Sequence, residues 1–247
     1  MIPDSLEHTL ERADSRPKMV YLIPNFQNPT GRTLSRERRE PIVRICERFD
    51  VPLIEDDPYG ELRFEGENLP SLISYPTHGT IVYLGTGSKI MAPGLRVAWV
   101  VTKDREVHER FVLAKQGADL HSGSLSQYVF HRFASRPEFE EHIRKIVRSY
   151  ERRRDVMHAA LGKHMPAGTE FNRPLGGMFL WARVPNIDTD ELLKISAEQK
   201  VVFVPGRSFY PDRDESDGMR LNFSNASEEK IGVGIERLGH AIRSFAR

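Results

Sequence analysis

The chain has 247 residues, 39% of them hydrophobic and 29% charged, and its 36 basic and 35 acidic side chains nearly cancel. A chain of this kind can bury a sizeable core and lacks the basic excess of nucleic-acid-binding domains. The single cysteine, Cys46, excludes an internal disulfide and fits a reducing compartment, so we expect a cytoplasmic protein. Residues 1–18 lack the features of a secretory signal, and no apolar run is long enough for a membrane span. The expected partner is therefore a small molecule.

The first half of the chain alternates apolar runs with a helical pattern. Four runs are predicted strands, at residues 20–24, 51–56, 80–84 and 96–102. Residues 35–49 are predicted to form a helix with one apolar face, although Pro41 is expected to delay or kink its start. Strands this apolar, the first two separated by a helix-length segment, are typical of a largely parallel sheet covered on both faces. We therefore expect an α/β fold with a mostly parallel sheet flanked by helices.

The second half of the chain begins with helices and then mixes strands with helices. Residues 105–161 are mostly helical in pattern, and five apolar residues form a predicted buried stripe: Phe139, Ile143, Ile146, Val147 and Tyr150. Four arginines are expected on the solvated face of that helix: Arg148, Arg152, Arg153 and Arg154. Strands are then predicted at 176–184, 201–205 and 219–224, and helices at 189–200 and 227–245. This pattern predicts a smaller α+β domain at residues 156–247, with a boundary near residue 155.

Polar turns lie at the ends of the first three predicted strands. They are Asn28-Pro29-Thr30-Gly31, Asp56-Asp57-Pro58-Tyr59 and Thr86-Gly87-Ser88-Lys89. In open α/β sheets, ligands bind at the carboxyl ends of the strands. The sequence therefore predicts a small-molecule site built from these three turns.

Lys89 stands in an unusual setting for a lysine, directly after a strand and beside two hydroxyl groups. Desolvation or nearby cations expose the lone pair of a lysine amine, which can then form an imine with a carbonyl. If that carbonyl belongs to pyridoxal phosphate, hydroxyls and a guanidinium must hold the phosphate. Thr86, Ser88 and Arg96 lie close to Lys89 in the sequence and are of those types.

The ring of such a cofactor makes two further demands. Its nitrogen stays protonated beside a carboxylate, because the positive ring is the electron sink of the chemistry, and Asp56 ends the second strand. Its ring oxygen needs hydrogen-bond donors, and Tyr59 and Asn28 provide two. Five functions on three strand ends make a more specific pattern than a lone lysine.

This ordered set of motifs, together with Arg96 and Arg220, resembles the class I and II aminotransferases of pyridoxal-phosphate fold type I. It is most similar to the branch of aminoadipate-type aminotransferases and the aminotransferase-like domains of MocR-type regulators. The resemblance runs from about Val20 to the C-terminus. It implies that residues 1–155 are part of the large cofactor-binding domain with a long connecting helix, and that residues 156–247 are the small domain.

The resemblance implies a role for each motif residue. Lys89 would be the Schiff-base lysine and the base that moves a proton between the substrate Cα and the cofactor. Asp56 would pair with the pyridinium nitrogen, and Arg220 would bind the substrate α-carboxylate. The remaining residues would complete the site: Tyr59 and Asn28 at the ring oxygen, Asn28 also at the substrate, and Thr86, Ser88 and Arg96 at the phosphate.

The activity implied by the resemblance is transfer of an α-amino group from an amino acid to a 2-oxo acid. The alternative is the effector domain of a MocR-type transcription regulator, which binds pyridoxal phosphate without turnover. By the same resemblance we expect a homodimer, and a chain that corresponds to the C-terminal portion of the family fold. No nucleic-acid or membrane partner is expected for these residues.

Several of these residues also have an ordinary structural interpretation. Asp57 competes with Asp56 for the carboxylate role, and the Asn-Pro-Thr-Gly turn is common in loops. Arg220 can instead form a structural salt bridge, and Thr86 and Ser88 can simply shape their turn. The nine histidines show no metal-ligand spacing, so no metal site is expected.

Overall fold

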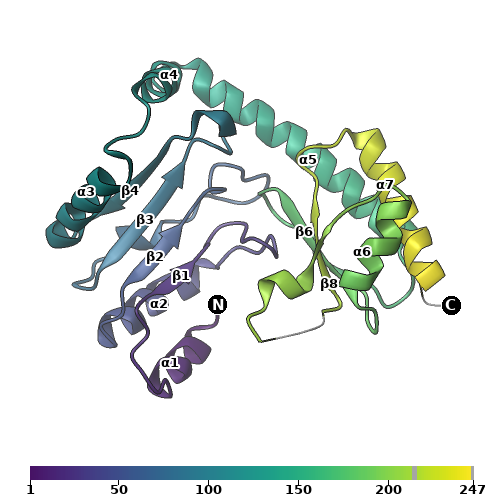
Figure 1. Ribbon diagram of the computed structural model, residues 1–247, viewed down its shortest axis with the longest axis horizontal. Coiled ribbons are helices and arrows are strands. Elements are labelled where there is room, and N and C mark those ends of the chain that lie inside the picture. The colour runs from purple at the N-terminus through teal and green to yellow at the C-terminus, as the bar shows by residue number, and fades with distance from the viewer. Residues whose placement is uncertain (213–215, 246–247) are drawn as a thin grey trace. The chain divides into compact units, whose positions relative to one another are not determined.

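The computed structural model describes residues 1–212 and 216–245, and the chain divides into two compact units (Figure 1). The first unit comprises Met1–Asn25, Thr33–Glu61 and Gly66–Arg144. The second comprises Phe26–Arg32, Leu62–Glu65 and Lys145–Arg247. The change from one unit to the other therefore falls at Arg144 on the long helix, whereas the sequence placed a domain boundary near residue 155. Two short segments of the first half also belong to the second unit.

The first unit is built on a four-stranded sheet in the order β1-β2-β3-β4. The strands are β1 (Val20–Leu22), β2 (Leu53–Asp56), β3 (Ile81–Thr86) and β4 (Ala98–Thr102). β1, β2 and β3 are parallel, as predicted, and β4 is antiparallel to β3. The connection from β3 to β4 holds only a 3-10 turn, which is short for the crossover that a parallel neighbour needs.

The helices of the first unit are α1 (Pro3–Glu11), α2 (Arg36–Arg48), α3 (Arg105–Asp119) and α4 (Ser124–Ala134), with 3-10 turns η1 (Leu72–Ser74) and η2 (Pro93–Leu95). α2 buries Ile42, Val43 and Cys46 in a core shared with Leu53 of β2. The prediction that Pro41 delays the start of the helix is wrong, because α2 begins at Arg36 and continues through the proline. A proline near the start of a helix removes a single backbone hydrogen bond, and the buried apolar face outweighs that loss.

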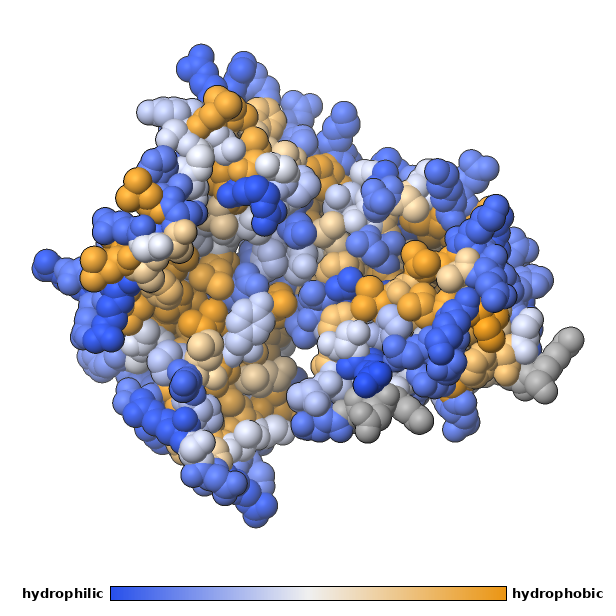
Figure 2. Space-filling view, viewed as in Figure 1, coloured by the Kyte–Doolittle hydropathy of each residue, from blue (hydrophilic) through white to orange (hydrophobic). Residues whose placement is uncertain are grey.

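Hydrophobic side chains remain at the surface of β4 and α3. Trp99, Val100 and Val101 of β4 are exposed, as are Phe111 and Val112 of α3. Figure 2 shows hydrophobic surface where these elements lie. The expectation of a sheet covered on both faces is therefore wrong for β4 within the described residues.

The second unit contains an antiparallel sheet in the order β5-β6-β8-β7. Its strands are β5 (Glu170–Phe171), β6 (Phe179–Arg183), β7 (Val204–Pro205) and β8 (Gly218–Asn222). Its helices are α6 (Thr189–Glu198), α7 (Glu228–Phe245) and most of α5 (Glu138–His164), with a 3-10 turn η3 (Gly206–Phe209). The core lies between the sheet and these helices and includes Leu180, Leu192, Met219 and Leu238.

The burial of α5 differs from the prediction. The five residues of the expected stripe are only half-buried: Phe139, Ile143, Ile146, Val147 and Tyr150. The buried residues of this helix are Arg154, Met157 and Leu161. The prediction that Arg154 lies on the solvated face is therefore wrong. Arg154 lies three residues before Met157 and seven before Leu161, so it is on the same face of the helix as they are. This spacing could have indicated its burial, but the neighbouring arginines favoured a solvated position.

No helix among the residues that the structure describes is long and apolar enough to cross a membrane.

Leu180 tests the core of the second unit. Its side chain is 0% exposed in β6, so Leu180→Ala is expected to lower the free energy of unfolding by about 2–5 kcal/mol through lost burial and a residual cavity. Urea unfolding followed by Trp181 fluorescence in a Trp99→Phe background measures this change. Val202→Ala, at a side chain that is 77% exposed, is the control and is expected to change stability by less than about 0.5 kcal/mol. Equal effects of the two substitutions would contradict the assignment of the core.

Candidate functional site

The carboxyl ends of β1, β2 and β3 lie at the same edge of the first unit's sheet, because the three strands are parallel. Asp56 is the last residue of β2 and pairs with Leu84 of β3. Thr86 is the last residue of β3, and Lys89 follows in the turn after it. The structure thus brings the predicted carboxylate and the turn with the predicted lysine to neighbouring strand ends.

Tyr21 of β1 donates a hydrogen bond from its hydroxyl to Oδ2 of Asp56. Tyr21 pairs with Ile54, two residues before Asp56, so both side chains stand on one face of the sheet. Burial raises the pKa of Tyr21 above its ordinary value, and the hydrogen bond to Asp56 raises that pKa further. The tyrosine therefore stays protonated and orients the carboxylate. Tyr21 could not be predicted as a partner of Asp56, because the alternation within a strand does not show which residue of the neighbouring strand lies beside it.

Asp57 is held by a different set of contacts. Both of its carboxylate oxygens accept hydrogen bonds from Nδ2 of Asn25, each at 3.0 Å. Asn25 in turn accepts a hydrogen bond of 2.7 Å from Arg39, whose side chain is buried. Burial raises the pKa of Asp57, and the bond from Asn25 and the charge of Arg39 oppose that rise. This network gives Asp57 a structural role and favours Asp56 as the residue at the site.

Arg39 also fixes the backbone around this network. Its guanidinium donates to the carbonyl oxygens of Leu34 at 3.2 Å, Pro70 at 2.8 Å and Pro24 at 3.4 Å. A planar guanidinium with five donors can satisfy several loop carbonyls at once. Arg39 therefore positions the loop that follows β1.

The turn from Thr86 to Lys89 is fixed by local hydrogen bonds. The backbone N–H of Gly87 and the hydroxyl of Thr86 both donate to the carbonyl of Val97, at 3.0 and 3.2 Å. The N–H of Ser88 donates to the Thr86 hydroxyl at 3.1 Å. Thr86 thus shapes its turn, as the structural interpretation expected, and phosphate binding by Thr86 and Ser88 stays a prediction. Lys89 is half-buried at the end of this turn.

Gly87 is required at its position by a close approach. A Cβ atom there would lie 2.4 Å from the ring of Phe130 on α4, much closer than real Cβ contacts. The glycine therefore lets α4 pack directly against the turn that carries Lys89.

Arg96 and Tyr59 are the other predicted site residues of the first unit. Arg96 follows η2 in the left-handed backbone region, with φ of 55°, and its guanidinium donates to the carbonyl of Pro93 at 3.1 Å. It does not open β4, as the sequence suggested, because that strand begins at Ala98. Tyr59 is 6% exposed and lies beyond the end of β2. The roles of both residues stay predictions.

Asn28 and Arg220 are brought together in the second unit. NH1 of Arg220 donates to the amide oxygen of Asn28 at 2.7 Å, although 192 residues separate them. The Arg220 guanidinium also lies 4.4 Å from the ring centre of Phe179 and 5.4 Å from that of Phe209. Cation–π contacts of this kind hold a guanidinium in one orientation. The sequence did not indicate this pairing, nor that Asn28 belongs to the same unit as Arg220.

The comparisons with known proteins identify the family. The model of aminotransferase classes I and II matches residues 2–238. The chain therefore belongs to the class I and II aminotransferase family, and it has the α/β architecture of pyridoxal-phosphate fold type I.

Individual relatives agree with this assignment. The chain is 40% identical to aromatic-amino-acid aminotransferase 1 of Thermococcus litoralis, over 95% of this chain and 56% of that protein. It is 36% identical to 2-aminoadipate transaminase of Thermus thermophilus, over 98% of this chain and 61% of the relative. The crystal structure of Pyrococcus horikoshii kynurenine aminotransferase superposes with a TM-score of 0.93 at 38% identity, over 99% of this chain and 60% of that one. The chain thus spans less than two thirds of the length of these relatives.

In the part of the chain that the structure describes, no group of three or more His, Cys, Asp or Glu side chains is placed to hold a metal ion.

The two neighbouring aspartates are expected to respond differently to substitution. Asp57→Ala removes the two carboxylate oxygens that accept from the buried amide of Asn25, and this is expected to lower the free energy of unfolding by about 1–3 kcal/mol. Asp56→Asn retains an acceptor for the Tyr21 hydroxyl, so a change within about 0.5 kcal/mol is expected. Urea unfolding of the two variants measures the difference. A larger loss for Asp56→Asn would reverse the two roles.

Proposed function

We propose that the protein is a pyridoxal-phosphate-dependent aminotransferase that moves an α-amino group from an amino acid to a 2-oxo acid. The observation that carries the proposal is the position of Asp56 at the end of β2 and of Lys89 in the turn after β3, because these two strands are parallel neighbours. Relatives of 36–40% identity are named as aminotransferases, and we therefore favour the enzyme over a regulator's effector domain.

The donor set of the first unit fits this cofactor. It offers an amine on Lys89, a carboxylate on Asp56 that is oriented by Tyr21, and the hydroxyls and guanidinium of the phosphate set: Thr86, Ser88 and Arg96. When bound, pyridoxal phosphate supplies a protonated ring that withdraws electrons from the substrate α-carbon.

The protein's own residues supply binding and proton transfer. The amine of Lys89 takes and returns the proton of the substrate α-carbon. By the family resemblance, the charge of the Asp56 carboxylate would keep the ring nitrogen protonated, and Tyr59 and Asn28 would be the donors to the ring oxygen. The planar fork of Arg220 binds a substrate carboxylate through two parallel hydrogen bonds, and Asn28 holds that fork in place.

We also propose a homodimer in the cytoplasm. The dimer rests on the family resemblance, and the reducing compartment rests on the single buried thiol of Cys46. Sedimentation of the purified protein tests the dimer.

The role of Lys89 is tested by chemical trapping. A lysine amine and the cofactor carbonyl form an imine, and borohydride reduces its carbon–nitrogen double bond to a stable single bond. Treatment of the protein with pyridoxal phosphate and then borohydride is therefore expected to label Lys89. Peptide mapping by mass spectrometry locates the label, and Lys89→Ala is expected to remove it. Lys103→Ala, at a lysine that follows β4, is the matched control and is expected to leave the label in place. Labelling at another lysine, or none at all, would contradict the proposal.

Arg220 is tested by a charge-conserving substitution. Arg220→Lys keeps the positive charge but loses the two parallel hydrogen bonds, so KM for the amino acid is expected to rise about 10-fold to 100-fold. Steady-state kinetics over a range of amino acid concentrations measures this rise. Arg207→Lys, at an exposed arginine of η3, is expected to leave KM unchanged. An unchanged KM for Arg220→Lys would exclude Arg220 from carboxylate binding.

A further inference from the structure

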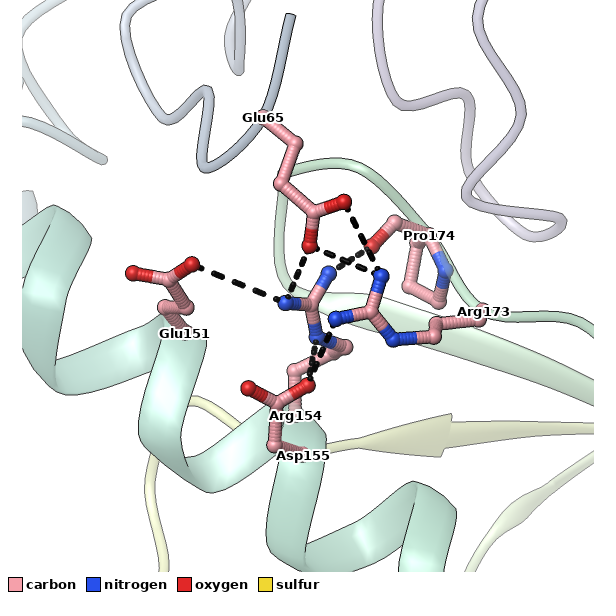
Figure 3. A network of polar contacts seen from close by, with 6 residues as sticks. All are labelled: Glu65, Glu151, Arg154, Asp155, Arg173 and Pro174. Carbon is pink, nitrogen blue, oxygen red and sulfur yellow. Dashed lines mark hydrogen bonds and ion pairs between the residues drawn. The ribbon is translucent and has the colours of Figure 1, made fainter.

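A buried arginine on α5 lies among carboxylates of the second unit (Figure 3). The side chain of Arg154 is 0% exposed, and its guanidinium lies 2.7 Å from Glu65, 2.7 Å from Asp155 and 3.8 Å from Glu151. Burying a charge is costly unless it is paired, and a buried ion pair adds little stability over apolar packing of the same volume. Arg154 therefore contributes less through stability than through the segments that it holds in position.

A second arginine completes the network. Arg173 contacts Glu65 at 2.8 Å and Asp155 at 3.1 Å, so the two guanidinium groups share the same two carboxylates. Burial raises the pKa of Glu65, but hydrogen bonds from Arg154 and Arg173 outweigh burial and hold that pKa below its ordinary value. The carboxylate therefore remains charged and paired at neutral pH.

The network clamps two loop segments to each other. Arg154 donates from NH1 to the carbonyl of Pro174 at 2.6 Å, and its guanidinium lies 5.2 Å from the ring centre of Phe64. The backbone N–H of Phe64 donates to the carbonyl of Leu175 at 2.9 Å, and that of Gly177 donates to Leu62 at 2.8 Å. Segment 172–177 is thus held against segment 62–65.

The same segment supports the loop that carries Asn28. The side chain of Asn172 donates to the carbonyl of Thr30 at 2.7 Å. Gly31 has φ of +65°, and a Cβ atom added there would lie 2.5 Å from the carbonyl oxygen of Phe179 and 3.1 Å from Cβ of Pro174. The loop therefore lies against Asn172 and Pro174, and Arg154 bonds the backbone carbonyl of Pro174.

We propose that Arg154 is a positioning residue that acts through segment 172–177 on the loop of residues 26–32, and so sets the geometry of the Asn28–Arg220 pair. The chain of contacts runs from the Arg154 guanidinium to the carbonyl of Pro174, then to the loop, and from Asn28 to Arg220. The link to substrate binding rests on the proposed function, whereas the ordering of the loop does not.

Hydrogen–deuterium exchange of the protein without cofactor or substrate tests the positioning directly. The amides of Gln27 and Gly31 bond within the loop, to Arg32 at 2.8 Å and to Gln27 at 2.6 Å, so they report its order. Arg154→Gln is expected to speed exchange in the peptide covering 26–32 by about tenfold or more, with little change in α7. Arg152→Gln is the matched control, because Arg152 lies on the same helix in an exposed pair with Glu228, and it is expected to exchange like the wild type.

Glu65→Gln provides a milder second variant. It removes one charge at a partly exposed carboxylate while keeping its shape, so it is expected to speed exchange in the same peptide by a smaller factor. If Arg154→Gln does not fold, Glu65→Gln is the variant that tests the positioning role of Arg154. If a folded Arg154→Gln variant exchanges residues 26–32 at the wild-type rate, the positioning role is overturned. If Arg154→Gln does not fold, wild-type exchange of these residues in Glu65→Gln overturns it.

Kinetics then separates this role from the proposed function. Arg154→Gln is expected to raise KM for the amino acid about tenfold, while borohydride labelling of Lys89 is unchanged and Arg154→Lys restores part of the loss. A protein that shows the exchange effect but no transamination would refute the proposed function and retain the positioning role. A folded Arg154 variant with faster exchange and wild-type KM would refute the link to the substrate.

Discussion

The parallel pairing of β2 with β1 and β3 is the constraint on which the candidate site depends. Because these strands run in the same direction, their carboxyl ends and the turns that follow them meet at one edge of the sheet. Asp56 and the turn with Lys89 reach that edge through backbone pairing alone. A slip of one residue in the register of β2 would turn Asp56 to the other face, away from Tyr21.

In each unit a buried arginine holds loop segments in place. Arg39 in the first unit and Arg154 in the second are 0% exposed, and each donates to backbone carbonyls of loop segments. Irregular segments lack the hydrogen-bond ladders of helices and sheets, so their buried carbonyls need donors from side chains. A guanidinium provides several donors in one plane, which a lysine amine cannot match. In each unit the arginine therefore orders a loop next to predicted site residues.

The motif residues stand out in the sequence because each lies in or within a few residues of an apolar strand. The side chains that orient these residues could not be predicted from the sequence. Tyr21 lies 35 residues from Asp56, and Asn25 lies 32 residues from Asp57. Arg154 lies 89 residues from Glu65, and its place in a run of arginines favoured a solvated position. Contacts over such separations leave no local pattern, whereas a strand followed by a polar turn does.

By itself, the sequence determined the order of strands and helices, the α/β class and the residue types at the three strand ends, because these follow from local periodicity and turn chemistry. Only the tertiary structure decided that β4 runs antiparallel at the sheet edge, that Arg154 is buried among carboxylates, and that Asn28 joins Arg220 in the second unit. Each of these depends on which distant segments pack together, and that choice is made by the burial and hydrogen bonding of the whole chain rather than by any one segment.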